Sequence, residues 1–154
     1  MQISVEGNFR GINKFLNVTK KQLQESLKNA LSITAQDGVR IIKERTAKGE
    51  GYKGKFAPYS KGYAELKANG WKAGTFEDDP RSFSGDASRV VNLFVRGAML
   101  GGMATTVDNE KATIYFTTGE LSKRAAKNDK TRPFFGFNAR EQTELGKTFI
   151  RYMK

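Results

Sequence analysis

The chain has 154 residues, a length that fits one domain with a buried core. It contains no cysteine and no histidine, which excludes disulfides, thiolate metal sites and the commonest general base. Lysine and arginine number 27 against 16 acidic residues, and the net charge of +11 favours either an anionic partner such as nucleic acid or a lysine-rich solvated surface.

Neither a targeting segment nor a membrane segment is expected. The first residues, MQISVEGNF, lack the basic region and the apolar stretch of a signal peptide. No apolar run approaches the ~20 residues that a helix needs to cross a bilayer. We therefore expect no contact with a membrane.

The first elements in chain order are a strand and a long helix. Apolar and polar residues alternate in QISVE, residues 2–6, which predicts a short strand. Apolar residues then recur at intervals of three and four between Leu23 and Ile42. This pattern predicts a helix from about Lys20 to Thr46.

The start and the length of this helix carry further expectations. Thr19 with Gln22 has the spacing of a capping box, and Val18 with Leu23 that of a hydrophobic staple. A helix of ~40 Å crosses a whole domain of this size. Either Gly38 kinks it, or one end projects towards a neighbour.

Residues 48–86 form a long connection that seven glycines punctuate. Only SKGYAELKANG, residues 60–70, has a helical pattern, with Ser60 as the cap and Gly70 as the stop. Connections of this length are usually functional or disordered. We interpret the connection as an arm whose aromatic residues pack either on a neighbouring subunit or on their own domain.

The stretch GEGYKGKF, residues 49–56, partly matches two nucleotide-binding motifs. A triphosphate loop needs Ser or Thr after the lysine, where this chain has Phe56. Both motifs also need a preceding strand and a following helix, whereas this stretch follows a helix. We interpret its glycines as letting the chain turn and lead Phe56 and Tyr59 into packing sites.

Residues 90–118 are predicted to form strands, with one helical turn among them. VVNLFV, residues 90–95, is β-branched and predicts a strand, and GAMLGGM, residues 97–103, a helical turn. MATTVD and KATIYFTT alternate on either side of Asn109-Glu110, which predicts a β-hairpin.

Two capping patterns place the last helices. Thr117 with Glu120 predicts a short helix over residues 120–128. RPFFGF, residues 132–137, suits the start or edge of a strand. Asn138 with Glu141 opens a final helix, whose one apolar face holds Leu145, Phe149 and Tyr152.

The order of elements predicts an α+β fold in a single domain, residues 1–154. A long N-terminal helix and a C-terminal helix are expected to pack on a small, mainly antiparallel sheet. The fold is also expected to include the long glycine- and aromatic-rich arm or insertion, residues 48–86.

No constellation predicts an enzyme. The serines have no histidine to activate them. Glu77, Asp78 and Asp79 form an acidic cluster, but a calcium loop spaces its ligands at alternate positions, so these residues read as a solvated turn. We expect no catalytic residue, no cofactor and no metal.

The stretch GKFAPYSKGYAELK resembles the G-x-x-F-x-P-Y-S-x-x-Y-x-x-x-K pattern of tailed-phage virion morphogenesis proteins, the tail-completion family of Mu-like and related phages. The matching positions are Gly54, Phe56, Pro58, Tyr59, Ser60, Tyr63 and Lys67. The resemblance continues in order to the C-terminus, at Leu93, Gly97, Met99, Leu100, Ala125, Ala126, Asn128 and Arg132 to Gly136.

This resemblance implies a structural protein of the phage neck or tail end, made in the bacterial host cytoplasm and incorporated in the virion. Such proteins act in tail completion or termination or in head–tail joining. They form homo-oligomeric rings, commonly of six subunits, and contact other neck or tail proteins. Non-specific contact with phage DNA is compatible with this role, and a basic DNA-binding module is the alternative function.

The arm and the RPFFGF segment supply the candidate assembly contacts. Pro58 restricts its own φ and that of Ala57, so the aromatics on either side are held as rigid anchors. Rigid aromatics suit interface hot spots, although packing on the protein's own core is the competing role. The candidates are Phe56, Pro58, Tyr59, Tyr63, Trp71, Arg132, Phe134 and Phe135.

Overall fold

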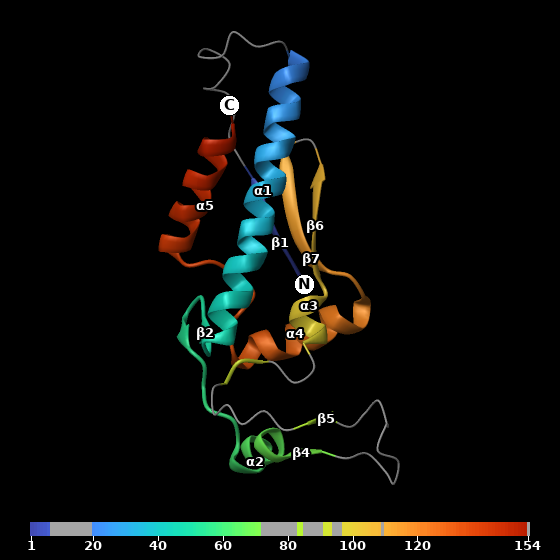
Figure 1. Ribbon diagram of the computed structural model, residues 1–154, viewed down its shortest axis with the longest axis vertical. Coiled ribbons are helices and arrows are strands. Elements are labelled where there is room, and N and C mark those ends of the chain that lie inside the picture. Colours follow the sequence, from blue (N-terminus) through green and yellow to red (C-terminus); the bar gives the residue numbers. More distant parts are fainter. Residues whose placement is uncertain (7–19, 72–82, 85–90, 94–96, 109, 154) are drawn as a thin grey trace.

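The structure is a computed structural model that describes residues 1–6, 20–71, 83–84, 91–93, 97–108 and 110–153 (Figure 1). In chain order its elements are β1 (Gln2–Glu6), α1 (Lys20–Ala47), β2 (Glu50–Gly51), β3 (Gly54–Lys55), α2 (Lys61–Asn69), β4 (Gly70–Trp71), β5 (Phe83–Ser84), α3 (Ala98–Gly101), β6 (Met103–Asp108), β7 (Lys111–Phe116), α4 (Gly119–Thr131) and α5 (Ala139–Tyr152).

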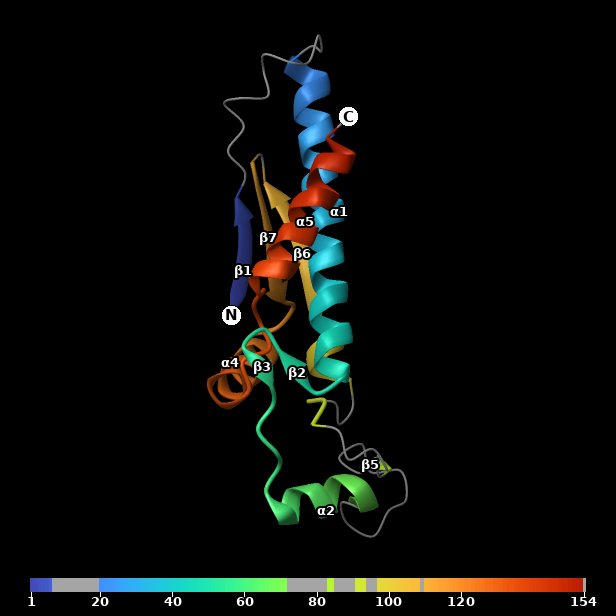
Figure 2. The same cartoon turned by 90° about the vertical axis from the view of Figure 1, so that its left-hand side faces the viewer.

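The three longest strands form an antiparallel sheet in the order β1-β7-β6. Ile114 in the central strand pairs with Ile3 on one side and with Thr105 on the other. The long helix α1 lies along this sheet, and α5 packs beside α1 (Figures 1 and 2). The expected α+β fold, with both helices and a small antiparallel sheet, is confirmed.

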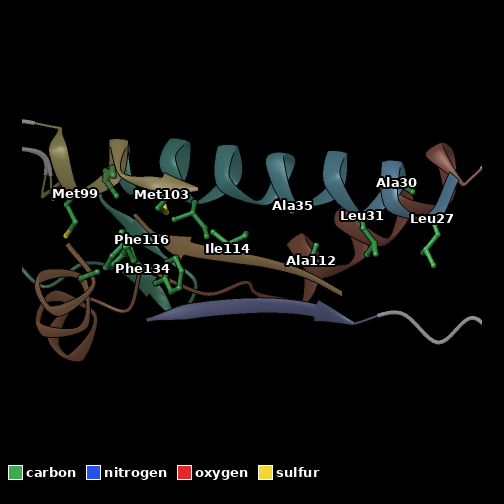
Figure 3. Close-up of a cluster of buried hydrophobic side chains, with 14 of the residues drawn as sticks. Leu27, Ala30, Leu31, Ala35, Met99, Met103, Ala112, Ile114, Phe116 and Phe134 are labelled. Atoms are coloured by element: carbon green, nitrogen blue, oxygen red, sulfur yellow. The ribbon is translucent and has the colours of Figure 1, made fainter. Parts of the chain in front are cut away.

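The core lies between α1 and the sheet (Figure 3). Alternate residues of β7 point into it, because successive strand side chains face opposite sides of a sheet. The buried stripe of α1 covers them, and burying each large apolar side chain stabilises the fold by ~1.5–3 kcal/mol. The largest apolar side chains that are fully buried in the core are Leu31, Ile42, Ile114 and Phe134.

The helix α1 begins at Lys20 as predicted and ends at Ala47, one residue beyond the predicted end, and Gly38 lies within its unbroken length. A Cβ at Gly38 would lie 2.9 Å from the ring of Phe137 and 3.1 Å from the side chain of Ile114. Gly38 therefore allows a close approach rather than a kink. The N-terminal end of α1 extends beyond the sheet and α5 (Figures 1 and 2). Val18 and Thr19, the predicted staple and cap, lie outside the described residues.

The prediction of a strand at residues 90–95 is wrong for the part that the structure describes, residues 91–93. Leu93 has a φ of 53°, in the left-handed region that a strand excludes. Its backbone N–H donates to the hydroxyl of Tyr59 at 3.2 Å instead of to a neighbouring strand. A side chain of the arm therefore holds this backbone group, and it does not join a sheet.

The cap of α4 and its length also differ from the prediction. The side chain of Thr118, not of Thr117, accepts from the backbone N–H of Leu121. The N–H of Thr117 donates to the carbonyl of Gly102, so this residue still belongs to the end of the β6–β7 hairpin. The helix continues to Thr131, beyond the predicted end at residue 128.

Residues 132–137 form no strand, and side chains take up several of their backbone hydrogen bonds. The N–H groups of Phe134 and Phe135 both donate to Asp129 Oδ1 at 2.9 Å. The guanidinium of Arg45 donates to the carbonyls of Phe134 at 2.6 Å and Gly136 at 2.9 Å. This buried arginine fixes the segment against the end of α1.

The predicted capping box of α5 is confirmed. Asn138 accepts from the N–H of Glu141, and the carboxylate of Glu141 accepts from the N–H of Asn138, each at 2.9 Å. The carboxylate of Glu141 also accepts a hydrogen bond from Arg45 Nη1 in a buried ion pair. One carboxylate therefore joins α1 to the start of α5. Leu145 on the predicted apolar face is buried, whereas Tyr152 is 41% exposed.

None of the helices in the described ranges combines the length and the apolar character that crossing a membrane requires.

Candidate interaction site

The stretch GEGYKGKF folds as a small hairpin of β2 and β3 at the end of α1. Gly49 and Gly54 have φ values of 80° and 122°, which glycine adopts without strain. The hairpin delivers Phe56, which is only 9% exposed, into the core. The expectation that these glycines turn the chain and lead Phe56 to a packing site is confirmed. The next helix, α2, begins only at Lys61.

The hairpin contacts the segment that precedes α5 at very short range. The N–H of Tyr52 donates to the carbonyl of Pro133 at 3.1 Å. A Cβ at Gly51 would lie 1.9 Å from that same carbonyl oxygen, so only glycine fits. The ring of Tyr52 covers Gly136 in a similar way, since a Cβ at Gly136 would lie 2.8 Å from it. This end of the arm therefore packs on its own subunit.

Beyond Phe56 the chain leaves the body, which we define as β1, α1, β6, β7, α3, α4 and α5. The helix α2 and the strands β4 and β5 lie apart from this body (Figures 1 and 2). Gly70 pairs with Ser84, and Trp71 with Phe83, so β4 and β5 form a small antiparallel pair beside α2. The part of the arm outside the body thus contains α2 and the β4–β5 pair.

Tyr59 is the centre of the contacts at the junction between arm and body. Its ring lies 4.8 Å from that of Tyr63, centroid to centroid, in an edge-to-face arrangement. The guanidinium carbon of Arg132 lies 4.7 Å from the Tyr59 centroid, and Lys67 Nζ lies 5.4 Å from it. With the hydrogen bond from Leu93, these contacts hold Tyr59 from several sides.

Arg132, at the end of α4, also holds the backbone of the arm. Its Nε donates to the carbonyl of Ala57 and its Nη2 to that of Pro58, each at 3.1 Å. The planar guanidinium suits this paired donation. Arg132 therefore joins α4 to the first residues of the arm beyond the hairpin.

Lys67 is buried at 2% exposure, which is unusual for a lysine. Its Nζ donates to Asn92 Oδ1 at 2.7 Å. This bond ties α2 to the chain segment that returns from the arm to α3. The resemblance pattern includes Lys67, but nothing in the sequence singles out Asn92.

A cleft of about 910 Å³ lies at this junction. One side comes from the arm, the second from the returning segment and α3, and the third from α4. Arg124, Lys127, Asn128 and Thr131 recur at intervals of three and four and so share one face of α4. The residues that line the cleft are Tyr59, Ser60, Tyr63, Leu93, Gly97, Ala98, Met99, Arg124, Lys127, Asn128, Thr131 and Arg132.

The structure separates the predicted contact residues into two groups. Tyr59, Tyr63 and Arg132 line the cleft, and Arg132 binds the carbonyl of the adjacent Pro58. Phe56, Phe134 and Phe135 instead belong to the core, and the last two are 0% and 5% exposed.

Within the subunit, Phe56, Phe134 and Phe135 therefore pack on the protein's own core, and an assembly contact at these positions stays a prediction. Phe134 and Phe135 pack with Phe116, since the ring centroid of Phe116 lies 6.5 Å and 5.0 Å from theirs. Trp71 lies in β4, and its side chain is outside what the structure describes.

The cations Arg124 and Lys127 were not singled out from the sequence. Their spacing of three residues on a predicted helix indicates that they share one face. Only the structure shows that this face lies opposite the arm and lines the cleft. Within the described ranges no group of three metal-ligating residues gathers. Glu77, Asp78 and Asp79, interpreted as a solvated turn, lie outside those ranges.

No protein-family model, no curated protein and no solved structure matches this chain.

Proposed function

We propose that the chain is a structural virion protein of the phage neck or tail end, which assembles as a ring. The observation that carries this proposal is the convergence of several of the resembling positions around one cleft. Tyr59 and Tyr63 of the arm, Met99 of α3 and Asn128 and Arg132 of α4 all line it. A pattern scattered along the sequence that gathers at one surface supports a shared role in assembly.

The projecting arm supports the same proposal. On α2, Tyr63 and Leu66 are 40% and 39% exposed, although both are large and apolar. Apolar side chains on an element that stands off from the body suit contact with a neighbouring subunit. In this role the protein needs no catalytic residue and no cofactor, and its partners are further copies and other neck or tail proteins.

Native mass spectrometry of the purified chain, followed by electron microscopy of phage particles, tests this function. We expect a discrete closed oligomer, of six subunits, and density for it where the tail meets the head. A chain that stays monomeric alone and with every neck and tail protein of its phage would contradict the proposal.

A DNA-binding module is the second candidate, and the charge of +11 favours it. Lys21 and Lys28 lie two turns apart on the exposed N-terminal part of α1, with Lys20 beside them. Phosphate contacts release counterions, so this function predicts an affinity that falls steeply with salt. A gel-shift series across salt concentrations, with Lys21→Glu/Lys28→Glu beside the parent, tests it. Weak binding without a discrete complex would reject this candidate.

A further inference from the structure

We propose that the cleft binds the acidic segment FEDD, residues 76–79, of a second copy of the chain. This inference rests on the proposed function, because it names the contact that joins neighbouring subunits of the ring.

The charge of the cleft is one-sided. Arg124, Lys127 and Arg132 line it, and no acidic side chain does so among the residues that the structure describes. Arg124 and Lys127 are exposed and lie one turn apart on the same face of α4. An occupant with several negative charges is therefore the complementary one.

The rest of the lining is apolar or aromatic. Tyr59 and Tyr63 form one wall, while Leu93, Ala98 and Met99 contribute apolar surface. Residues 76–79 combine one phenylalanine with three consecutive acids, and this is the acidic cluster of the chain. An aromatic ring and adjacent carboxylates match the two kinds of surface that the cleft offers.

The size of the cleft separates a short peptide from duplex DNA. Sites for small ligands measure roughly 300–1,000 Å³. At about 910 Å³ this cleft falls in that range, so it holds a few side chains. The rigid, convex backbone of a duplex does not enter a hollow of this size.

The cleft is also prepared before anything binds. Arg132 fixes the arm to α4 through Ala57 and Pro58. Leu93 keeps a left-handed φ of 53°, a conformation that costs energy for a residue with a side chain. Tyr59 holds it there by accepting from its N–H. Strain of this kind persists where the surrounding structure holds it, and Leu93 is one of the residues that line the cleft.

The segment and the cleft are different parts of the same sequence. Copies that pair a segment with a cleft join head to tail, and head-to-tail contacts close into rings when the rotation between copies allows it. This contact therefore gives the proposed ring a physical basis.

Charge reversal tests the contact. The cleft variant is Arg124→Glu/Lys127→Glu, and the segment variant is Glu77→Lys/Asp78→Lys/Asp79→Lys. The matched control is Lys123→Glu/Lys130→Glu, which changes two exposed cations of the same helix that do not line the cleft. Circular dichroism checks that each variant folds.

In native mass spectrometry we expect the cleft and segment variants each to assemble at least ~10-fold more weakly, while the control assembles as the parent does. A mixture of the two variants restores assembly, because each supplies the partner for the other. If both variants assemble as well as the control, the contact is overturned while ring formation stands. If assembly returns only when the cleft and segment changes are combined in one chain, and not in the mixture, the segment binds the cleft of its own chain. Binding to a second copy is then overturned.

A binding assay makes the contact measurable without a ring. A fluorescent peptide of residues 74–81, GTFEDDPR, is titrated with the segment variant, whose own segment does not compete. We expect binding that weakens at least ~10-fold when the cleft changes are added and that persists with the control changes. If the peptide binds but the parent never assembles, the proposed function is contradicted while the contact between segment and cleft stands. Failure of the peptide, with a DNA oligonucleotide binding through the same cations, would replace the contact by a nucleic-acid site.

Discussion

The guanidinium of Arg132 covers the ring of Tyr59, with 4.7 Å between its central carbon and the ring centroid. The same guanidinium donates to the carbonyls of Ala57 and Pro58 at 3.1 Å. One side chain of α4 thus holds both the backbone of the arm and its central aromatic residue. This contact is therefore one of those that position the arm on the body.

Arg132→Ala should release the start of the arm while the body stays folded. The lost cation–π contact and two hydrogen bonds are together worth ~1–3 kcal/mol. Limited proteolysis should then cut near residues 57–60 faster than in the parent, with little change in the melting temperature. Arg132→Lys keeps the charge but loses the paired donation. Its rate of cleavage should therefore lie between those of the parent and Arg132→Ala. Equal cleavage of Arg132→Ala and the parent would contradict this role.

Tyr59→Phe should expose the amide of Leu93 to exchange. The substitution removes only the hydroxyl that accepts from this N–H, and such a bond contributes ~1 kcal/mol. Hydrogen exchange at Leu93 should accelerate by roughly fivefold. Tyr63→Phe removes a hydroxyl from the neighbouring ring and serves as the control. Unchanged exchange in Tyr59→Phe would mean that another group protects the amide.

Phe56→Ala should destabilise the isolated subunit. Phe56 is 9% exposed and belongs to the core cluster, and emptying such a site costs ~3–5 kcal/mol. Urea unfolding measures the loss. Tyr63→Ala, at a position 40% exposed, should change the same free energy by less than ~1 kcal/mol and act on assembly instead. The opposite order of the two effects would place Phe56 on the subunit boundary.

Glu141→Ala should lower the free energy of unfolding more than the substitution of any exposed charged residue does. It leaves Arg45, which is 8% exposed, without its carboxylate partner and removes half of the capping box of α5. Breaking a buried pair in this way costs ~3–5 kcal/mol. Glu144→Ala, in an exposed pair with Arg140, should cost less than ~1 kcal/mol. Thermal and urea unfolding of both variants test the difference.

Gly51→Ala and Gly62→Ala should have opposite effects on stability. A Cβ at Gly51 would lie 1.9 Å from the carbonyl oxygen of Pro133, a backbone atom that cannot turn aside. A Cβ at Gly62, within α2, meets nothing within 4 Å, and alanine favours a helix over glycine by ~1 kcal/mol. Calorimetry should show Gly51→Ala melting well below the parent. A neutral Gly51→Ala would mean that the β2–β3 hairpin is free to move off Pro133.

The fold could be predicted where local pattern and tertiary packing agree. The bounds of α1 follow from an apolar stripe whose members Leu31 and Ile42 are fully buried, and α5 starts at its capping box. The prediction failed where side chains from distant parts of the chain take the backbone hydrogen bonds. Asp129 and Arg45 do so at Phe134, and Tyr59 does so at Leu93.

The candidate site was only partly predictable for the same reason. Tyr59, Tyr63 and Arg132 stood in the resembling pattern, and all three line the cleft. Aromatic character alone could not tell Phe56 or Phe134 from them, because core and interface use the same residues. Their roles separate only when the β2–β3 hairpin turns one set inward and leaves the other at the surface.

The pairing of β1 with β7 has a consequence for synthesis on the ribosome. Gln2 is opposite Tyr115, and Glu6 is opposite Lys111, so the first strand to be made has its partner among the last elements. At ~5–20 residues per second, β1 and the apolar stripe of α1 wait several seconds before that partner emerges. The hairpin β6–β7, by contrast, closes between neighbours in sequence as soon as it is made. A nascent chain that stalls before Lys111 therefore exposes an unpaired strand and an uncovered helix, and it is the form of this protein that chaperones should bind.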